Sequence, residues 1–227
     1  MVPNTPPVVA FGNAHTARIA TLGLNPSYIE FEDGYVAAGF GDLRYAPDST
    51  IGEILQDQYE YFQRKEYRWF KPLGTILNET HASYKEGSAA SLDLVQWATK
   101  PIWSKLSVTV RRKLLNQDVP FLAQQLQHEN FHTLLVNGSG VIKALQSHFH
   151  LELSLVDSIS GIPGTKNMPD TQVYSGRLFD RICVIAWDTN LQGTPFKGKG
   201  KKAQMIATLA TRIARMISTH CQALRRF

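Results

Sequence analysis

The sequence predicts an α/β fold, a three-layer α/β/α sandwich around a short, mostly parallel central sheet. Apolar runs of strand length alternate with amphipathic stretches of helix length, and this alternation implies crossover connections between parallel strands. The expected strands are nearly continuous in Leu, Val and Ile, as strands covered on both faces are. The chain has 227 residues, of which 43% are hydrophobic, so it can bury one large core and we expect a single domain over residues 1–227.

The elements follow from these patterns in chain order. The expected strands are the apolar runs at 18–24, 92–97, 133–137, 151–156 and 181–187. The expected helices are the amphipathic stretches at 50–64, 69–78, 106–127, 140–149 and 201–223, the last with one apolar stripe that faces the sheet. The segments 27–49, 161–174 and 188–200 are expected to be loops. Ligands bind beyond the carboxyl ends of the strands in such sheets, so chemistry is expected in the first and third of these loops.

Composition excludes several classes of protein. With 19% charged residues and a hydrophobic content typical of globular chains, this sequence is neither disordered nor collagen-like. No apolar run approaches the roughly 20 residues that cross a bilayer, and residues 1–7 lack a signal-peptide pattern, so no membrane association is expected. Cys183 and Cys221 are too few for a disulfide framework and lack metal-ligand spacing, so the expected location is cytoplasmic.

Positive charge is modest but uneven. The formal net charge is +5, and Lys197, Lys199, Lys201 and Lys202 fall close together after the last expected strand. Such a cluster suits a polyanion such as nucleic acid. The alternative is a solvated face without a partner.

A stiff turn follows the first expected strand. Gly23 permits a tight turn or a close backbone approach, and Pro26 biases Asn25 away from helical angles. The Asn25 carboxamide is thus held at a strand end, where it can orient a water molecule. The alternative is an ordinary turn, since Asn-Pro is a common turn signal.

A second polar segment follows the last expected strand, at residues 187–192, WDTNLQ. Leu191 is its single large apolar residue after Trp187, and on a surface loop it should be covered by something. One hypothesis is that Leu191 inserts into a base stack, as apolar wedges do in duplex DNA. The alternative is packing against a neighbouring loop.

Together these segments resemble the uracil-DNA glycosylase superfamily. Residues 21–27, TLGLNPS, are similar to the first motif of its mismatch-specific and single-strand-selective branches. Residues 134–140, LLVNGSG, resemble its strand-to-helix turn that faces DNA phosphate, and residues 187–192 occupy the place of its second motif, a loop with a DNA-penetrating Leu. The resemblance implies a monofunctional DNA glycosylase that flips a base out of DNA and cleaves the N-glycosidic bond with water, leaving an abasic site.

The resemblance also implies roles for individual residues. Asn25 would place the water, and Asp188 would activate it or stabilise the sugar cation. Phe40 would stack on the flipped base, with Tyr28, Phe31, Tyr35 and Tyr45 as rivals, and Ser27 and Asp93 would contact that base. Leu191 would fill the gap in the duplex. The residues expected to contact DNA phosphates are Ser139, Lys197, Lys199 and Lys201.

Departures from the family pattern bear on the base. The second motif begins with Trp187 where familiar members have His or Asn, so the usual support for a uracil anion is missing. Asp93 stands nearest the Asn that reads the uracil edge in several branches, and an ionised carboxylate matches the N4 amino group of cytosine rather than uracil O4. We therefore expect a modified cytosine, as in some phage DNA, with uracil as the alternative, in a repair or an antiviral defence role. No cofactor or metal is expected, because family Cys ligands for an iron–sulfur cluster are absent, and we expect a monomer.

Two other classes of function stay open. Residues 193–199, GTPFKGK, match the first seven positions of a phosphate-binding P-loop, which predicts a nucleotide-binding protein. However, Gly200 replaces the Ser or Thr that would hold magnesium, and Pro195 removes one N–H. The remaining class is a DNA-binding module without catalysis. The histidines show no zinc pattern.

Overall fold

A computed structural model describes residues 1–2, 5–31, 48–64, 69–160, 170–192 and 201–221. Its centre is one six-stranded sheet in the order β2-β1-β3-β6-β5-β4. The strands are β1 (Ile19–Gly23), β2 (Ala89–Asp93), β3 (Thr133–Asn137), β4 (Leu153–Ile159), β5 (Thr171–Leu178) and β6 (Ile182–Trp187). Strands β2, β1, β3 and β6 are parallel to one another, while β5 is antiparallel to both β6 and β4. The expected α/β class with a mostly parallel sheet is therefore confirmed.

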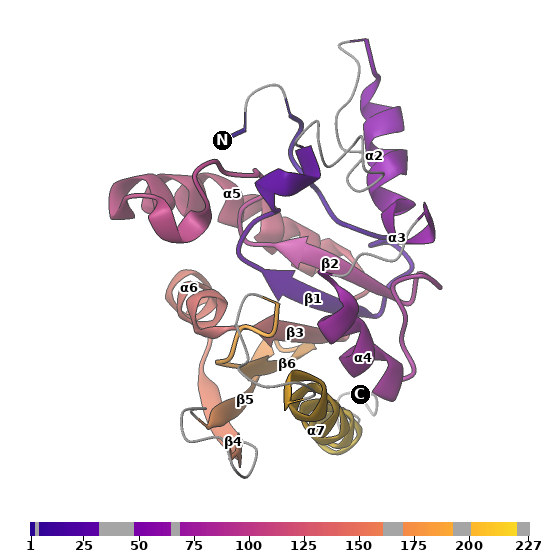
Figure 1. Cartoon of the computed structure of the whole chain (residues 1–227), viewed down its shortest axis with the longest axis vertical. Coiled ribbons are helices and arrows are strands. Elements are labelled where there is room, and N and C mark those ends of the chain that lie inside the picture. Colours follow the sequence, from indigo (N-terminus) through magenta and orange to yellow (C-terminus); the bar gives the residue numbers. More distant parts are fainter. Residues whose placement is uncertain (3–4, 32–47, 65–68, 161–169, 193–200, 222–227) are drawn as a thin grey trace.

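Helices cover both faces of this sheet, with α5 (Val108–His128) and α6 (Ser139–Phe149) on one face and α4 (Lys71–Glu79) and α7 (Lys201–Met216) on the other (Figure 1). The remaining helical segments are α2 (Ile51–Tyr59), α3 (Tyr61–Arg64), the short 3-10 turns η1 (Tyr28–Phe31) and η2 (Trp103–Lys105), and a π-helical turn, η3 (Ile217–Cys221). Among the described helices, none is long and apolar enough to cross a membrane.

Two hydrophobic cores follow from the alternation of side chains along the strands. In β3, Leu134 and Val136 belong to the core under α5 and α6, while Leu135 belongs to the core under α4 and α7. Successive strand residues point to opposite faces, so a fully buried strand must be apolar throughout. The continuous apolar runs therefore marked β1, β3 and β6 correctly, whereas the run at 92–97 overlaps β2 only at Leu92 and Asp93.

Strand β5 was not expected, because its residues fall partly in the segment predicted to be a loop. Its sequence, TQVYSGRL, is polar at several positions, and Thr171 and Val173 are its only fully buried residues before Leu178. The turn into β6 places Phe179 and Asp180 at positive φ and joins the Arg181 N–H to the Leu178 carbonyl. Such a turn usually carries Asn-Gly. Because Phe179-Asp180 stands there instead, no signal in the sequence marked this hairpin.

Candidate functional site

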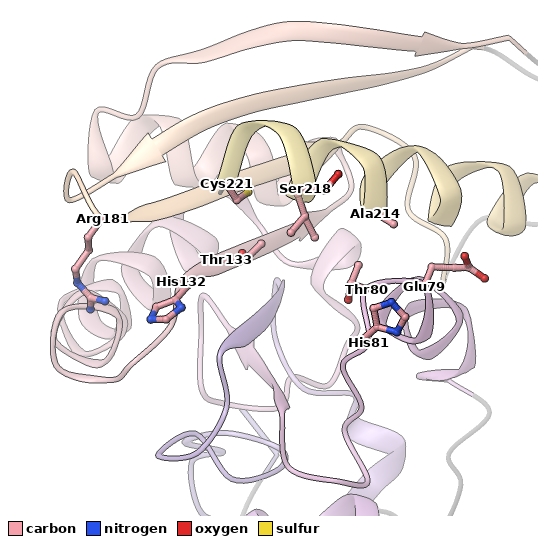
Figure 2. A pocket seen from close by; sticks show the side chains of 10 residues that line it. Glu79, Thr80, His81, His132, Thr133, Arg181, Ala214, Ser218 and Cys221 are labelled. Carbon is pink, nitrogen blue, oxygen red and sulfur yellow. The ribbon is translucent and has the colours of Figure 1, made fainter. Parts of the chain in front are cut away.

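Two large hollows lie at opposite ends of the parallel strands. The one at the amino ends has a volume of about 750 Å³, with His132 and Arg181 on one side and Glu79 and His81 on the other (Figure 2). Arg181 donates to the carbonyls of Leu126, Glu129 and Phe131, so its guanidinium is engaged in holding the end of α5.

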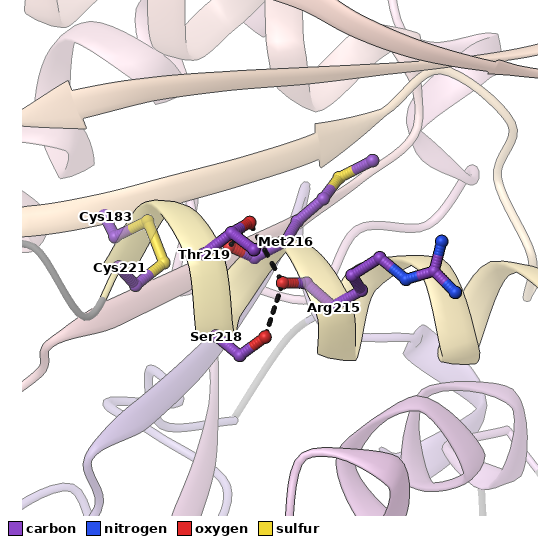
Figure 3. Close-up of a disulfide and its surroundings, with 6 residues drawn as sticks. All are labelled: Cys183, Arg215, Met216, Ser218, Thr219 and Cys221. Atoms are coloured by element: carbon purple, nitrogen blue, oxygen red, sulfur yellow. Dashed lines mark hydrogen bonds between the residues drawn. A yellow bond between two sulfur atoms is a disulfide. The ribbon is translucent and has the colours of Figure 1, made fainter.

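A disulfide lies beside this hollow. Cys183 of β6 is bonded to Cys221 of η3, 38 residues later, and so ties the end of the last helix to the sheet (Figure 3). Disulfides persist mainly in oxidising compartments. The two cysteines therefore do not support the expected cytoplasmic location, which rested partly on reading them as unlinked.

The second hollow lies at the carboxyl ends of β1, β2 and β3 and has a volume of about 520 Å³. We call it the strand-end pocket. Strand β1 sits between β2 and β3, so the loops that leave β1 and β3 diverge and open a crevice between them. The pocket brings together four residues singled out from the sequence: Asn25, Ser27, Asp93 and Ser139.

Asn25 is held by its amide nitrogen. Its Nδ2 donates to the Pro26 carbonyl at 3.0 Å, to the Trp97 carbonyl at 3.3 Å and to Thr99 Oγ1 at 3.2 Å. Among the described residues, no donor lies within hydrogen-bond distance of Asn25 Oδ1. The side chain therefore offers the pocket an oriented acceptor, which is the group that a water molecule needs.

Asp93 ends β2 and lies against Gly23 at the end of β1. A Cβ placed on Gly23 would come within 2.4 Å of Asp93 Oδ1, so only glycine leaves room for this carboxyl. Burial raises the pKa of Asp93 from 3.8 to about 7. With a pKa near 7, the group can be present at neutral pH both as the ionised acceptor expected from the sequence and as a neutral acid that can also donate.

Ser27 and Ser139 frame the pocket from the two diverging loops. Ser27 Oγ accepts from the Ile29 N–H at 3.3 Å and so starts the η1 turn. Ser139 is the exposed first residue of α6, and its N–H donates to the Asp188 carbonyl at 2.9 Å. Gly138 precedes it at φ 100°, and a Cβ there would lie 3.2 Å from Asn190 Cβ. The turn thus requires glycine and sets the helix N-terminus beside the pocket.

The second-motif loop is fastened by Asn137 at the end of β3. Asn137 Oδ1 accepts from Trp187 Nε1 at 2.9 Å and from the Leu191 N–H at 3.1 Å. Both Trp187 and Leu191 are fully buried, at 0% exposure, in the core under α4 and α7. The hypothesis that Leu191 is a DNA wedge is therefore wrong for this structure, and packing covers the side chain instead.

Asp188 does not line the strand-end pocket, although its carbonyl is bonded to Ser139 at the pocket's edge. Its Oδ1 accepts from the Gln172 N–H at 3.0 Å, which ends the pairing between β5 and β6. It is absent from the residues that line the pocket. The structure therefore does not bring Asp188 together with Asn25 as expected, because the carboxylate holds the end of the β5–β6 pairing.

The structure describes only two of the aromatic residues that were candidates for stacking on the base. Tyr28 lines the pocket, while Phe31 is fully buried in the core. Phe40, Tyr35 and Tyr45 lie outside the described residues, as do Lys197 and Lys199. Lys201 begins α7, and its side chain is also outside the description.

Sequence reasoning missed several pocket residues, and four of them bear on the chemistry. Glu30 is buried in the pocket wall, Trp69 is 47% exposed at the rim, and Asn190 and Gln192 come from the second-motif loop. Gln192 Nε2 donates to the Trp69 carbonyl at 3.2 Å, and this bond joins the second-motif loop to the segment that carries Trp69. The polar run after β6 was the available signal for Asn190 and Gln192, whereas Glu30 and Trp69 had none.

No family model and no curated protein sequence matches this chain. In the described part of the chain, no group of three His, Cys, Asp or Glu side chains is placed to hold a metal ion.

Proposed function

We propose that this protein is a monofunctional DNA glycosylase that receives a flipped, modified pyrimidine in the strand-end pocket. The observation that carries the proposal is Asn25, whose amide nitrogen makes three hydrogen bonds to the protein while its Oδ1 is left for the pocket. A fixed acceptor at a strand end can hold the attacking water behind the sugar C1′ without reorganising during the reaction. Asn25 thus fixes where that water attacks.

The base would lie between the two strand-end motifs. The volume of about 520 Å³ falls within the range that encloses a drug-sized ligand and leaves room for a substituent on the ring. Asp93 would contact the Watson–Crick edge, as a carboxylate accepts from the cytosine N4 amino group. Tyr28 and Trp69 are the described pocket aromatics best suited to stack on a flipped base, because both come from the rim segments.

The DNA backbone would run past the start of α6. Ser139 is exposed there, and a helix N-terminus favours phosphate. The Lys197–Lys202 cluster follows the second-motif loop in sequence, so it would extend this contact. These contacts position the duplex and carry no base specificity.

An abasic-site assay tests the proposal. The protein is incubated with oligonucleotides that carry uracil or different modified cytosines and with phage DNAs that contain modified bases, and alkali then cleaves the abasic sites. We expect cleavage at a modified cytosine, and Asn25→Ala should lower the rate on the order of a hundredfold or more. Asn116→Ala, an exposed change on α5, is the matched control and should keep the wild-type rate.

Three outcomes would overturn the proposal. A wild-type rate in Asn25→Ala would remove the water-positioning role. ATP or GTP binding that depends on Lys199, with no abasic sites on any DNA, would favour the P-loop-like nucleotide-binding protein instead. DNA binding without cleavage would favour a non-catalytic module.

A further inference from the structure

Glu30 is a pocket carboxyl that neither strand-end motif explains. It lies in η1, is only 5% exposed and lines the strand-end pocket. Its Oε2 is buried and has no hydrogen-bond partner among the residues that the structure describes. An ionised carboxylate in that position would carry an unpartnered buried charge, which is costly, so the neutral acid is the form that the wall accommodates.

The groups around Glu30 favour the same form. Burial raises the pKa of Glu30 from 4.5 to about 7, and the nearby Tyr61 hydroxyl of α3 offsets only part of this effect. Among the described residues that line the pocket there is no Lys, Arg or His, and its only other carboxyl is Asp93, so no positive side chain there favours the ionised form. The nearby Lys100 Nζ lies 5.3 Å from the centre of the Tyr28 ring.

We propose that Glu30 is the catalytic acid of this pocket, giving its proton to the departing base. This inference rests on the glycosylase function proposed above. As the C1′–N1 bond breaks, its electron pair goes to the base and the Glu30 proton goes to a base oxygen or nitrogen. Water then bonds to C1′ and returns one proton to the Glu30 carboxylate. The net reaction consumes one water molecule and releases a neutral base.

A proton donor would neutralise the negative charge that develops on a cytosine-type base as it leaves. Familiar uracil enzymes support a departing anion with the residue that Trp187 replaces, and Trp187 is buried here and donates to Asn137. A neutral acid with a pKa near the working pH can supply the charge compensation instead, as raised carboxyls in apolar pockets do elsewhere.

The test compares leaving groups of different quality. Single-turnover rates are measured for oligonucleotides with 5-hydroxymethylcytosine against 5-formylcytosine, and with uracil against 5-fluorouracil. In each pair the second base leaves more easily because its substituent withdraws electrons. Wild type should discriminate little within a pair, whereas Glu30→Gln should lose roughly 10²- to 10⁴-fold on the poorer leaving group and far less on the better one.

Controls separate this role from a structural one. Glu86→Gln removes an exposed carboxyl and should leave every rate unchanged. In wild type the rate should fall as pH rises above about 7, because the neutral acid is lost. That decline should persist in Asp93→Asn and be absent in Glu30→Gln. The comparison of wild type with Asp93→Asn can be made even if Glu30→Gln does not fold.

The outcomes are distinct. Equal losses on both members of a pair, or no loss, would overturn the role of Glu30 while the glycosylase function stands. A wild-type protein that releases no base from any substrate would overturn the glycosylase function and, with it, the acid. A leaving-group dependence confined to Glu30→Gln would support both.

Discussion

At the scale of single residues, the strand-end pocket holds two carboxyls whose charged forms are disfavoured. Burial raises the pKa of both Glu30 and Asp93 to about 7. In the unfolded chain both groups would titrate near their ordinary pKa values. The folded state therefore binds more protons than the unfolded chain between those ordinary pKa values and pH 7. The pocket therefore costs stability as it ionises, which is common where a site stores reactivity.

Glu30 makes this cost measurable. Its folded pKa lies above the unfolded one, so its contribution to the free energy of unfolding is complete below pH 4.5 and is lost as pH rises through about 7. Between pH 5 and pH 8 the free energy of unfolding of the wild type should fall by roughly 2–3 kcal/mol more than that of Glu30→Gln. Urea unfolding of both proteins at the two pH values checks this, and identical losses would show that the carboxyl is not held neutral.

Asp93 should make base preference depend on pH. The neutral acid can donate to uracil O4 and accept from N3–H, whereas the ionised form can only accept and so suits an amino group. The ratio of cytosine-type to uracil excision should therefore rise between pH 6 and pH 8, and Asp93→Asn should favour uracil at every pH. Using the ratio cancels any decline in rate that both bases share. A flat ratio in wild type would mean that Asp93 does not touch the base.

At the scale of elements, the second-motif loop is part of the core rather than a free arm. Leu191 lies under the sheet among residues of α7, and its N–H is fixed by Asn137. Asn137 joins the carboxyl end of β3 to the carboxyl end of β6. The second-motif loop, which follows β6, and the start of α6, which follows β3, therefore hold each other in place. A wedge into DNA would have to come from another segment.

Leu191→Ala should behave as a core truncation. We expect a loss of about 2–5 kcal/mol in the free energy of unfolding, because a buried side chain leaves a cavity. Excision from single-stranded and double-stranded substrates should fall by the same factor at a temperature where the variant is folded. A loss confined to duplex DNA would restore the wedge hypothesis.

At the scale of the whole molecule, a disulfide ties the turn that follows α7 to the sheet. The disulfide between Cys183 and Cys221 closes a loop of 38 residues that includes the second-motif loop and α7. The double change Cys183→Ser and Cys221→Ser should lower the free energy of unfolding by roughly 2–4 kcal/mol, chiefly by freeing the unfolded chain. Unfolding of the wild type with and without reductant should show a shift that the double variant lacks.

The lysine cluster at residues 197–202 is predicted to contact DNA phosphates. Replacing Lys197 and Lys199 by Ala should weaken binding similarly for all sequences and reduce the salt dependence by roughly one unit of slope for each lost phosphate contact. Fluorescence anisotropy at several salt concentrations measures this. An unchanged slope would place the cluster away from the backbone.

Local patterns were enough for the central strands and the Asn25 turn. The strand at Thr133–Asn137 was predicted with its observed bounds, because burial on both faces makes every position apolar. The Asn-Pro step predicted a held carboxamide, since its geometry depends on adjacent residues. The carboxyl ends of parallel strands meet at one edge, so Asn25, Asp93 and Ser139 could be expected to share a pocket.

Long-range contacts decided the rest. The burial of Leu191, the engagement of Asp188 with Gln172, the pairing of Cys183 with Cys221 and the place of Glu30 in the pocket wall each depend on partners distant in sequence or on the closed shape of the molecule. A side chain's neighbours determine whether it is solvated, paired or neutral, and one sequence does not specify those neighbours. The sequence alone therefore located the candidate site, while the tertiary structure decided which of its groups can do chemistry.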